Sequence, residues 1–303
     1  MEARFSMKQL LAFLCSFIAA DLYASSCCVS NTSVSNLMIL PANWQQTLGV
    51  SQGRVIGDVN EKGTSTFRND KNKDVLNSVR FDLSYGWNLQ YQSGVSLKYQ
   101  NRSRELNGTE ANESGWNDVG LFHAYRPVPL ERIWIFQTLN IPTATSTYES
   151  TSAMGVDARG TGTYISSIGV FGIYNLKEWD FTYGPEVHHS FGKTFKNNDV
   201  TTEVGSFWGT SFSLGAGYIP WRSKSRYGLS ITPRFEEGKD LVLNGQKNEG
   251  KDSLVWDTSL NYTYTITAEY SVGLSYTDQT IIGPSQNTLL NRSLSFLFQT
   301  RWP

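Results

Sequence analysis

The sequence lacks long apolar runs and has no excess of charge of either sign. Its most apolar stretch, Leu10 to Ala20, is broken only by Cys15 and Ser16. No later stretch approaches the roughly 18 apolar residues that a membrane-spanning helix needs. Lysine and arginine number 26 and aspartate and glutamate 27, so no basic face indicates nucleic acid binding. The composition excludes a helical membrane bundle and gives no support to a nucleic acid partner.

Cysteine and histidine are also scarce, with three residues of each. Their spacing fits no zinc site, and we predict neither a metal nor a cofactor. Cys27 and Cys28 are adjacent, so they can form a vicinal disulfide or bonds to other chains but cannot cross-link distant parts of the fold. The segment from Ala24 to Cys27 also has some likeness to a lipoprotein cleavage box, in which Cys27 would be lipidated. The sequence leaves these alternatives open.

Residues 1–24 have the order of a secretory signal peptide. Arg4 and Lys8 supply positive charge before the apolar run, and Ala24 is a small residue at a suitable cleavage point. A buried N-terminal helix is the alternative, but the order of charged, apolar and small residues favours export. We therefore expect the mature protein to act outside the cytoplasm.

Aromatic residues and side-chain alternation are abundant. In residues 75–100, apolar and polar side chains alternate, stop at residues 86–88, and alternate again. The apolar set is Val79, Phe81, Leu83, Tyr85, Val95, Leu97 and Tyr99. A period of two places the apolar side chains on one face of a strand and the polar ones on the other. Two long strands joined by a tight turn are predicted here.

The same unit recurs to the C-terminus and gives about twelve strands, an even number. Short and long connectors alternate, and the long ones are polar. Backbone groups at an open sheet edge are costly in hydrocarbon, so a sheet in a membrane must close. A soluble β-sandwich would alternate too, but it has no reason to sort its connectors by end. We predict an all-β fold, a closed antiparallel transmembrane β-barrel with short periplasmic turns and long external loops.

This prediction divides the chain into three parts. Residues 1–24 are the signal peptide, residues 25–45 a periplasmic segment or a plug in the lumen, and residues 46–303 the barrel. The first strand is expected at Thr47 to Asp58. The expected location is the outer membrane of a Gram-negative bacterium, with outer-membrane lipid as one partner. The barrel-assembly machinery, which would contact the C-terminal strand, is a second expected partner.

The polar face of the strands predicts the lining of the lumen. It carries charges of both signs: Arg80, Asp82, Lys98, Asp180, Glu186, His188, Arg234, Glu236, Asp257 and Glu269. Such charges can form a constriction that filters small solutes. Equally, they can pair with one another across the interior and stabilise the barrel, since an unpaired buried charge is costly. The sequence does not decide between these two uses.

Three segments resemble a known family. They are SVRFDLSYGWNLQYQSGVSLKY from Ser78, GWNDVGL from Gly115 and LNIPTATS from Leu139. Together they resemble the outer-membrane barrels of the phenol-degradation meta-pathway, relatives of the long-chain fatty-acid transporters. Lys98 stands where that family often has proline, and Trp116-Asn117 occupies its GxGD region. The resemblance, which covers Val75 to Gly192, implies a barrel and the uptake of hydrophobic compounds.

His188-His189-Ser190 is the one cluster with a catalytic appearance. Outer-membrane lipid hydrolases place a histidine and a serine on the lipid-facing side, where the histidine activates the hydroxyl. Here no acid completes a triad, and the histidine is not followed by Ser-Asn-Gly. We predict that the protein is not an enzyme and that it forms a pore for small molecules, hydrophobic ones included. A closed barrel whose external loops bind a partner is the alternative, and no residue identifies a substrate.

Overall fold

A computed structural model describes residues 42–69, 72–128, 132–152, 154–197, 200–283 and 285–303. All regular structure in these segments is β-strand. None of them contains a helix long and apolar enough to cross a membrane. The signal peptide, Cys27, Cys28 and most of the expected plug lie outside the described residues.

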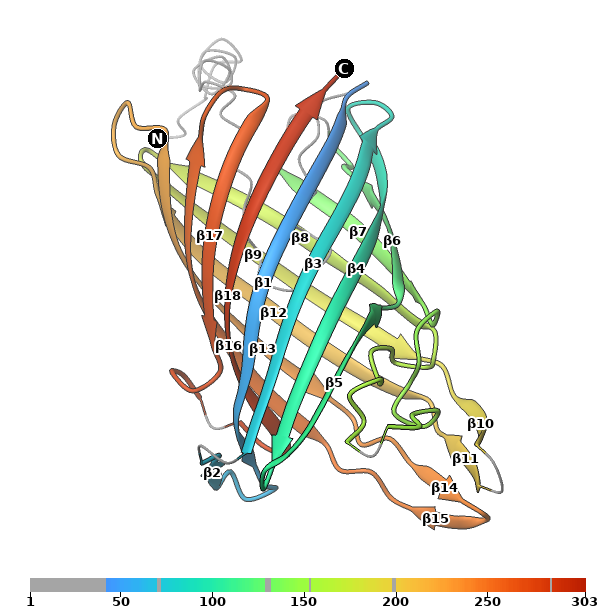
Figure 1. The fold of residues 1–303 in the computed structure, drawn as a ribbon. Helices are drawn as coiled ribbons and strands as arrows, with labels where there is room; N and C mark the ends of the chain where they lie inside the picture. Colours follow the sequence, from blue (N-terminus) through green and yellow to red (C-terminus); the bar gives the residue numbers. More distant parts are fainter. Residues whose placement is uncertain (1–41, 70–71, 129–131, 153, 198–199, 284) are drawn as a thin grey trace, which may run out of the picture.

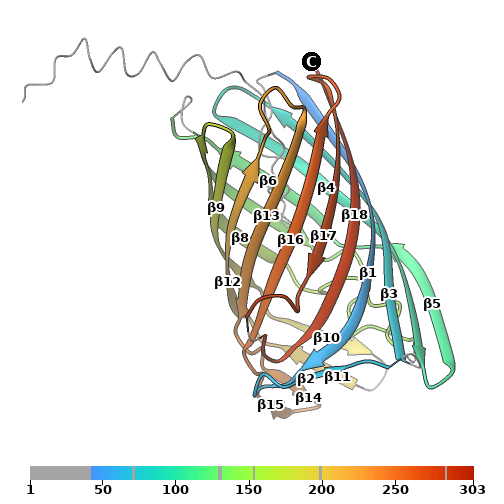
Figure 2. The ribbon, with the colours of Figure 1, turned by 90° about the vertical axis from the view of Figure 1, so that its left-hand side faces the viewer.

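Twelve long strands close into one antiparallel barrel, shown in two views in Figures 1 and 2. In chain order they are β1 (Trp44–Val59), β3 (Asn72–Gly86), β4 (Tyr91–Leu106), β6 (Val119–Tyr125), β7 (Ile133–Ile141), β8 (Ile165–Leu176), β9 (Trp179–Ser190), β12 (Phe207–Tyr218), β13 (Ser225–Glu236), β16 (Ser253–Thr265), β17 (Tyr270–Asp278) and β18 (Thr288–Trp302). Each pairs with its neighbour along the chain, and β1 also pairs with β18. The predicted closed antiparallel barrel is confirmed.

The seam between β1 and β18 closes the barrel. Its register runs from Trp44 opposite Trp302 to Val59 opposite Thr288, with one irregularity between Val55 and Gly57. The barrel wall therefore begins at Trp44, earlier than the expected boundary at residue 46 and the expected strand start at Thr47. The expectation was late because Gln46, which lies on the outer face, is polar and interrupts the alternation before Thr47.

Connectors between barrel strands are sorted by end, as predicted. Short connectors span residues 87–90, 126–132, 177–178, 219–224 and 266–269. These lie at the end where β18 stops, at the top of Figure 1, and the long connectors lie at the opposite end. With the short turns periplasmic, every long connector is external.

The external connectors contain strands of their own, which the sequence analysis did not predict. β2 (Ser65–Phe67) pairs with β1, and β5 (Thr109–Trp116) pairs with β4. A separate four-stranded sheet consists of β10 (Lys193–Asn197), β11 (Val200–Val204), β14 (Leu241–Leu243) and β15 (Gln246–Asn248). Two of these hairpins turn at Asn107-Gly108 and Asn244-Gly245, where all four residues have positive φ. That geometry matches the twist of paired strands and explains why the chain doubles back in register.

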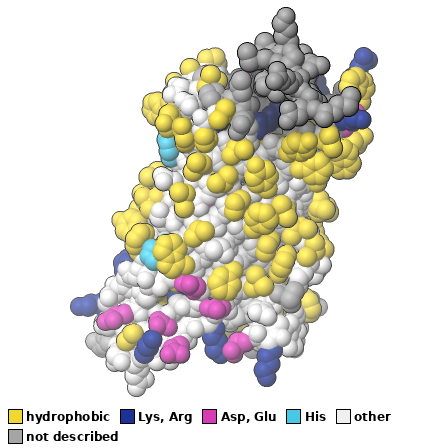
Figure 3. Space-filling view, turned by 180° about the vertical axis from the view of Figure 1, so that it is seen from behind, with side chains coloured by type: hydrophobic (Ala, Val, Ile, Leu, Met, Phe, Trp, Pro, Cys, Tyr) yellow, Lys and Arg dark blue, Asp and Glu magenta, His cyan; other side chains and the backbone are white. Residues whose placement is uncertain are grey.

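The two faces of the barrel differ in polarity. Val50, Val79 and Leu294 are 51%, 44% and 51% exposed. Their inward-facing neighbours, such as Asp82 and Ser259, are buried. Figure 3 shows apolar side chains covering the middle of the outer surface, with charged side chains gathered at the external end. An apolar surface of this extent is stable when lipid covers it.

Candidate functional site in the barrel interior

The interior is the candidate site because its charged side chains remain accessible. Alternation places Arg80, Arg104 and Arg234 on the inner face, yet their side chains are 27%, 29% and 34% exposed. A completely filled barrel would bury them. Solvent therefore reaches the inner wall.

One basic region lies on β3 and β4. Arg80 Nε contacts Asp82 Oδ1 at 2.8 Å, and Asp82 is buried. Lys98 stands directly opposite Arg80 in the register of the two strands. Within the described part of the chain, Lys98 has no ion-pair partner. Like charges placed opposite one another repel, so this pair presents positive charge to the lumen.

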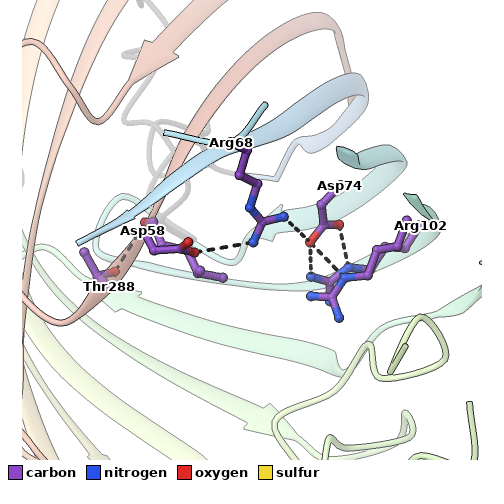
Figure 4. Close-up of polar contacts among 7 residues, drawn as sticks. Asp58, Arg68, Asp74, Arg102 and Thr288 are labelled. Carbon is purple, nitrogen blue, oxygen red and sulfur yellow. Dashed lines mark hydrogen bonds and ion pairs between the residues drawn. The ribbon is translucent and has the colours of Figure 1, made fainter. Parts of the chain in front are cut away.

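A second charged cluster, which the sequence did not predict, lies at the external mouth (Figure 4). Asp74 is fully buried and accepts hydrogen bonds from Arg102 Nε at 2.9 Å, Arg102 Nη2 at 2.8 Å and Arg104 Nε at 2.9 Å. Arg68, from the connector before β3, lies 3.6 Å from Asp74 and 3.4 Å from Asp58. Three guanidinium groups around one carboxylate leave the mouth positive. The sequence did not reveal this cluster because Asp74 lies within a polar, charged run, which predicts a loop and not the start of a strand.

Across the barrel, charges pair over glycines of β12. Arg226 Nε on β13 donates to Asp180 Oδ2 on β9 at 2.7 Å, and both side chains are buried. Between them lies Gly217, where a Cβ would come 2.3 Å from Arg226 Nη2. Because Gly217 has no side chain, the side chains of β9 and β13 can contact each other directly over β12.

The same arrangement recurs nearer the external end. His188 Nε2 on β9 lies 4.0 Å from Glu236 Oε1 on β13. Gly209 lies between them, and a Cβ there would come 2.3 Å from the His188 ring. The inner faces of β9, β12 and β13, together with β16, are called the ionic wall below.

Asp257 and Glu186 complete the ionic wall and differ from each other. Asp257 Oδ2 lies 2.9 Å from Arg234 Nη2, and its Oδ1 accepts a hydrogen bond of 2.7 Å from Gln279. Glu186 stands opposite Gly169 on β8 and Ser211 on β12. Among the residues that the structure describes, Glu186 has no ion-pair partner.

Glu269 does not lie on the inner wall, which corrects its assignment to the lumen. It sits in the exposed turn before β17, where its Oε2 accepts a hydrogen bond from Thr267 Oγ1 at 2.7 Å. That hydrogen bond holds the pKa of Glu269 below its usual value. Ala268 and Tyr270 were expected on the outer face, so alternation predicted that Glu269, between them, faces inward. The strand begins only at Tyr270, and alternation does not apply to the turn before it.

The inner face of β6, β7 and β8 is apolar in its periplasmic half, which the sequence analysis did not predict. Its buried residues are Phe122, Ala124, Trp134, Phe136, Phe171 and Ile173, called the aromatic wall below. Their neighbours Leu121, Ile135 and Ile168 are exposed on the outer face. The available signal was the segment 133–141, which is apolar on both faces in part and so shows no clean alternation.

The connector of residues 142–164 is anchored to the wall at several points. Asp118 accepts hydrogen bonds from Ala144 N at 3.0 Å and Thr161 N at 2.7 Å. Arg104 Nη1, on the inner face of β4, donates to the carbonyl oxygen of Met154. This connector is therefore tied to the inner wall next to the external mouth.

Asp157 organises the middle of this connector. Its carboxylate accepts hydrogen bonds from the Ser150 hydroxyl, from Thr151 N at 2.8 Å and from Ser152 N at 3.3 Å. Burial would raise the pKa of Asp157, but these hydrogen bonds outweigh it and hold the pKa below its usual value. The neighbouring Val156 is 1% exposed.

The histidine–serine cluster faces the wrong way for a lipid hydrolase of the kind considered above. His188 and Ser190 share the inner face, and Ser190 Oγ lies 2.8 Å from Thr163 Oγ1 with both hydroxyls buried. His189 packs against the exposed Trp208, with ring centroids 4.4 Å apart. The serine is thus placed away from lipid.

Neither a family model nor a curated protein sequence matches this chain. Among solved structures, it is similar to an outer membrane channel from Pseudomonas putida F1, with a TM-score of 0.70, 11% identity, and coverage of 88% of this chain and 97% of that one. It is also similar to the beta domain of the Bordetella autotransporter Brka, with a TM-score of 0.52, 12% identity, and coverage of 87% and 100%. These similarities agree with the resemblance drawn from the sequence at the level of fold.

The protein has the fold of an outer-membrane β-barrel. Closure of the sheet, the apolar outer surface and the fold of its structural neighbours all lead to this conclusion. Its outer surface contacts membrane lipid, and its inner wall holds the candidate site.

Proposed function

We propose that the protein is a channel that passes small molecules, hydrophobic ones included, across the outer membrane. One observation carries the proposal: solvent reaches charged side chains on the inner wall, and the interior combines these charged and polar strands with an aromatic wall of buried rings on one side. A barrel stabilised only by inward ion pairs would need no aromatic wall. The similar fold of a Pseudomonas putida outer membrane channel supports the proposal.

Most inward charges also stabilise the barrel under this proposal. Asp82, Asp180 and Asp257 each pair with an arginine. Both uses weighed from the sequence therefore apply to the interior, with pairing for most residues and solute contact for the rest. The proposed lining contains these three aspartates and their partners Arg80, Arg226 and Arg234. It also contains Lys98, Glu186, His188 and Glu236.

Further assignments belong to the same proposal. No catalytic role is assigned to the interior. Residues 1–24 direct export and are removed, and residues 25–45, apart from the start of β1, form a periplasmic segment or a plug. The barrel-assembly machinery recognises β18, which is the last barrel strand along the chain and forms the closing seam with β1.

A second candidate function is partner binding by the external surface of a closed barrel. The four-stranded sheet of β10, β11, β14 and β15 favours it, because paired strands present a rigid surface. The anchored connector 142–164 favours it as well, since hydrogen bonds hold it to the barrel next to the external mouth.

Conductance of the refolded protein in a planar lipid bilayer tests the channel directly. Stable ohmic current steps are expected. Absence of steps from a protein that still shows heat-modifiable gel mobility would contradict an open channel and favour the closed barrel. Deleting residues 25–41 from the silent protein would then show whether that segment blocks the lumen.

A further inference from the structure

Arg301 on β18 faces inward without an ion pair in the described residues, but it donates hydrogen bonds to Gln45 and Gln299. Two other charges on the inner wall remain available for a solute. Ion pairs occupy Asp82, Asp180, Asp257 and the arginines that face them. Within the described residues, Lys98 and Glu186 are inward-facing charges without an ion pair. They carry opposite signs and belong to different strands, β4 and β9.

These two residues lie at the same level of the barrel. Lys98 is seven residues beyond Tyr91, the first residue of β4, and Glu186 is seven residues beyond Trp179, the first residue of β9. Both strands start at short connectors, so the two positions are equally far from the periplasmic end. For twelve strands about 4.8 Å apart and tilted by about 40°, the backbones of β4 and β9 lie on the order of 20 Å apart. Long side chains on both strands narrow the gap between the two charges to on the order of 10 Å.

The aromatic wall lies between them. Passing round the barrel from β4 to β9, the chain order gives β6, β7 and β8. Phe122 is three residues from the periplasmic end of β6, and Phe136 is three residues from that of β7. The aromatic rings therefore lie four residues nearer the periplasmic end than the two charges, about 13 Å along a strand.

We propose that Lys98 and Glu186 form a two-point site for small zwitterionic solutes that carry an apolar, aromatic-sized body. A solute carboxylate would contact Lys98, with Arg80 next to it, and a solute ammonium group would contact Glu186. The apolar body would extend toward the periplasmic end, where the aromatic wall begins. Solutes with only one charge would lose one contact and leave one wall charge unsatisfied. This inference rests on the proposed channel function and names the substrate class for it.

Block of the single-channel current at neutral pH tests this site. Phenylalanine is compared with its singly charged analogues, 3-phenylpropanoate and 2-phenylethylamine. Phenylalanine is expected to half-block the current at a concentration about tenfold lower than either analogue, which corresponds to about 1.4 kcal/mol. Lys98→Gln and Glu186→Gln should each remove most of this preference.

Matched controls change the same kinds of charge on the outer face. Lys73 and Glu105 pair with each other at 2.8 Å near the external end of β3 and β4. Lys73→Gln and Glu105→Gln should leave the half-blocking concentrations unchanged. Heat-modifiable mobility of all four variants confirms that the barrels are folded.

The outcomes separate this site from the channel itself. A protein that conducts salt but is blocked equally by the three compounds has no two-point site, and the channel stands. Equal loss of preference in inner and outer variants would also overturn the site. If the protein conducts no salt, the proposed channel function is wrong. Calorimetric titration of the folded barrel with phenylalanine then tests the two-point site by itself, and absence of binding would refute that site.

Discussion

The aromatic wall and the ionic wall fill space on the inside of one barrel with different chemistry. On β6 and β7, phenylalanine rings lie over glycines of the neighbouring strands, Phe122 over Gly94 and Phe136 over Gly169. On the ionic wall, charged side chains lie over glycines of β12 and meet across it. Glycine provides the room in both places, and the neighbouring side chain determines whether the wall is apolar or charged.

This difference has an energetic consequence. Packed rings contribute through burial and close contact, so they tolerate swaps of similar volume but not loss of volume. Buried ion pairs are costly to form and more costly to break singly, because a lone buried charge remains. The aromatic wall should therefore respond to changes in volume, and the ionic wall to changes in charge balance.

The largest effect is expected at the buried ion pair of the ionic wall. Asp180→Ala leaves the Arg226 guanidinium buried without its carboxylate, so it should lower the free energy of unfolding by about 3–5 kcal/mol. The double variant Asp180→Ala with Arg226→Met removes both charges and should recover most of that loss. Urea unfolding in lipid vesicles measures both. If the double variant is as unstable as the single one, charge balance is not what stabilises this wall.

A slightly smaller effect is expected from loss of volume in the aromatic wall. Phe136→Ala removes a ring that is 3% exposed and should lower the free energy of unfolding by about 3 kcal/mol. Phe136→Leu keeps most of the volume and should cost less than about 1.5 kcal/mol. The same urea titration compares the two. If Phe136→Ala lowered the free energy of unfolding by less than Phe136→Leu does, the ring would not be closely packed.

Adding a methyl group tests the two walls at their glycines. A Cβ on Gly94 would lie 2.3 Å from the Phe122 ring and 2.5 Å from the carbonyl oxygen of Leu83. Since the backbone must shift, Gly94→Ala should cost about 1–3 kcal/mol. Gly209→Ala should cost less, because the His188 side chain is 18% exposed and has room to rotate away. Reversal of this order would mean that the ionic wall is the more rigid one.

The smallest effect concerns only the connector that joins β7 to β8. The pKa of Asp157 is lowered in the folded state, so its contribution is complete above the unfolded pKa of about 3.9 and is lost as pH falls through the folded pKa. Cleavage of residues 150–157 by pepsin should increase as pH is lowered through this window while the barrel stays intact. Asp157→Asn should remove this pH dependence, and an unchanged pH profile in that variant would contradict the role given to Asp157.

Alternation was sufficient to predict the barrel and most of its inward charges. Val79 and Asp82 lie on opposite faces as their spacing requires, and a period of two determines facing without further information. It does not determine which side chains meet across strands. Asp180 and Arg226 are far apart in sequence, and their contact depends on the register of three strands and on Gly217. The ion pair could therefore not be predicted, although both residues were visible.

Other features gave no alternating signal at all. In β7 the residues from Ile133 to Phe136 are apolar on both faces, so alternation could not show an apolar inner wall. Asp74 lies in a run of polar residues that resembles a loop. Strands in the external connectors are short and show no sustained alternation, and Asn-Gly turns mark only two of their hairpins.

The seam between β1 and β18 has a consequence for how the chain folds. Every other pair of neighbouring barrel strands is linked by a connector of modest length, and such local pairing is quick because little chain entropy is lost. Trp44 and Trp302, in contrast, are separated by the whole barrel sequence. Their pairing is the most non-local step, so closure should limit the folding rate. Until it occurs, the two unpaired edges are open to other chains, and a lipid environment or a chaperone must protect them.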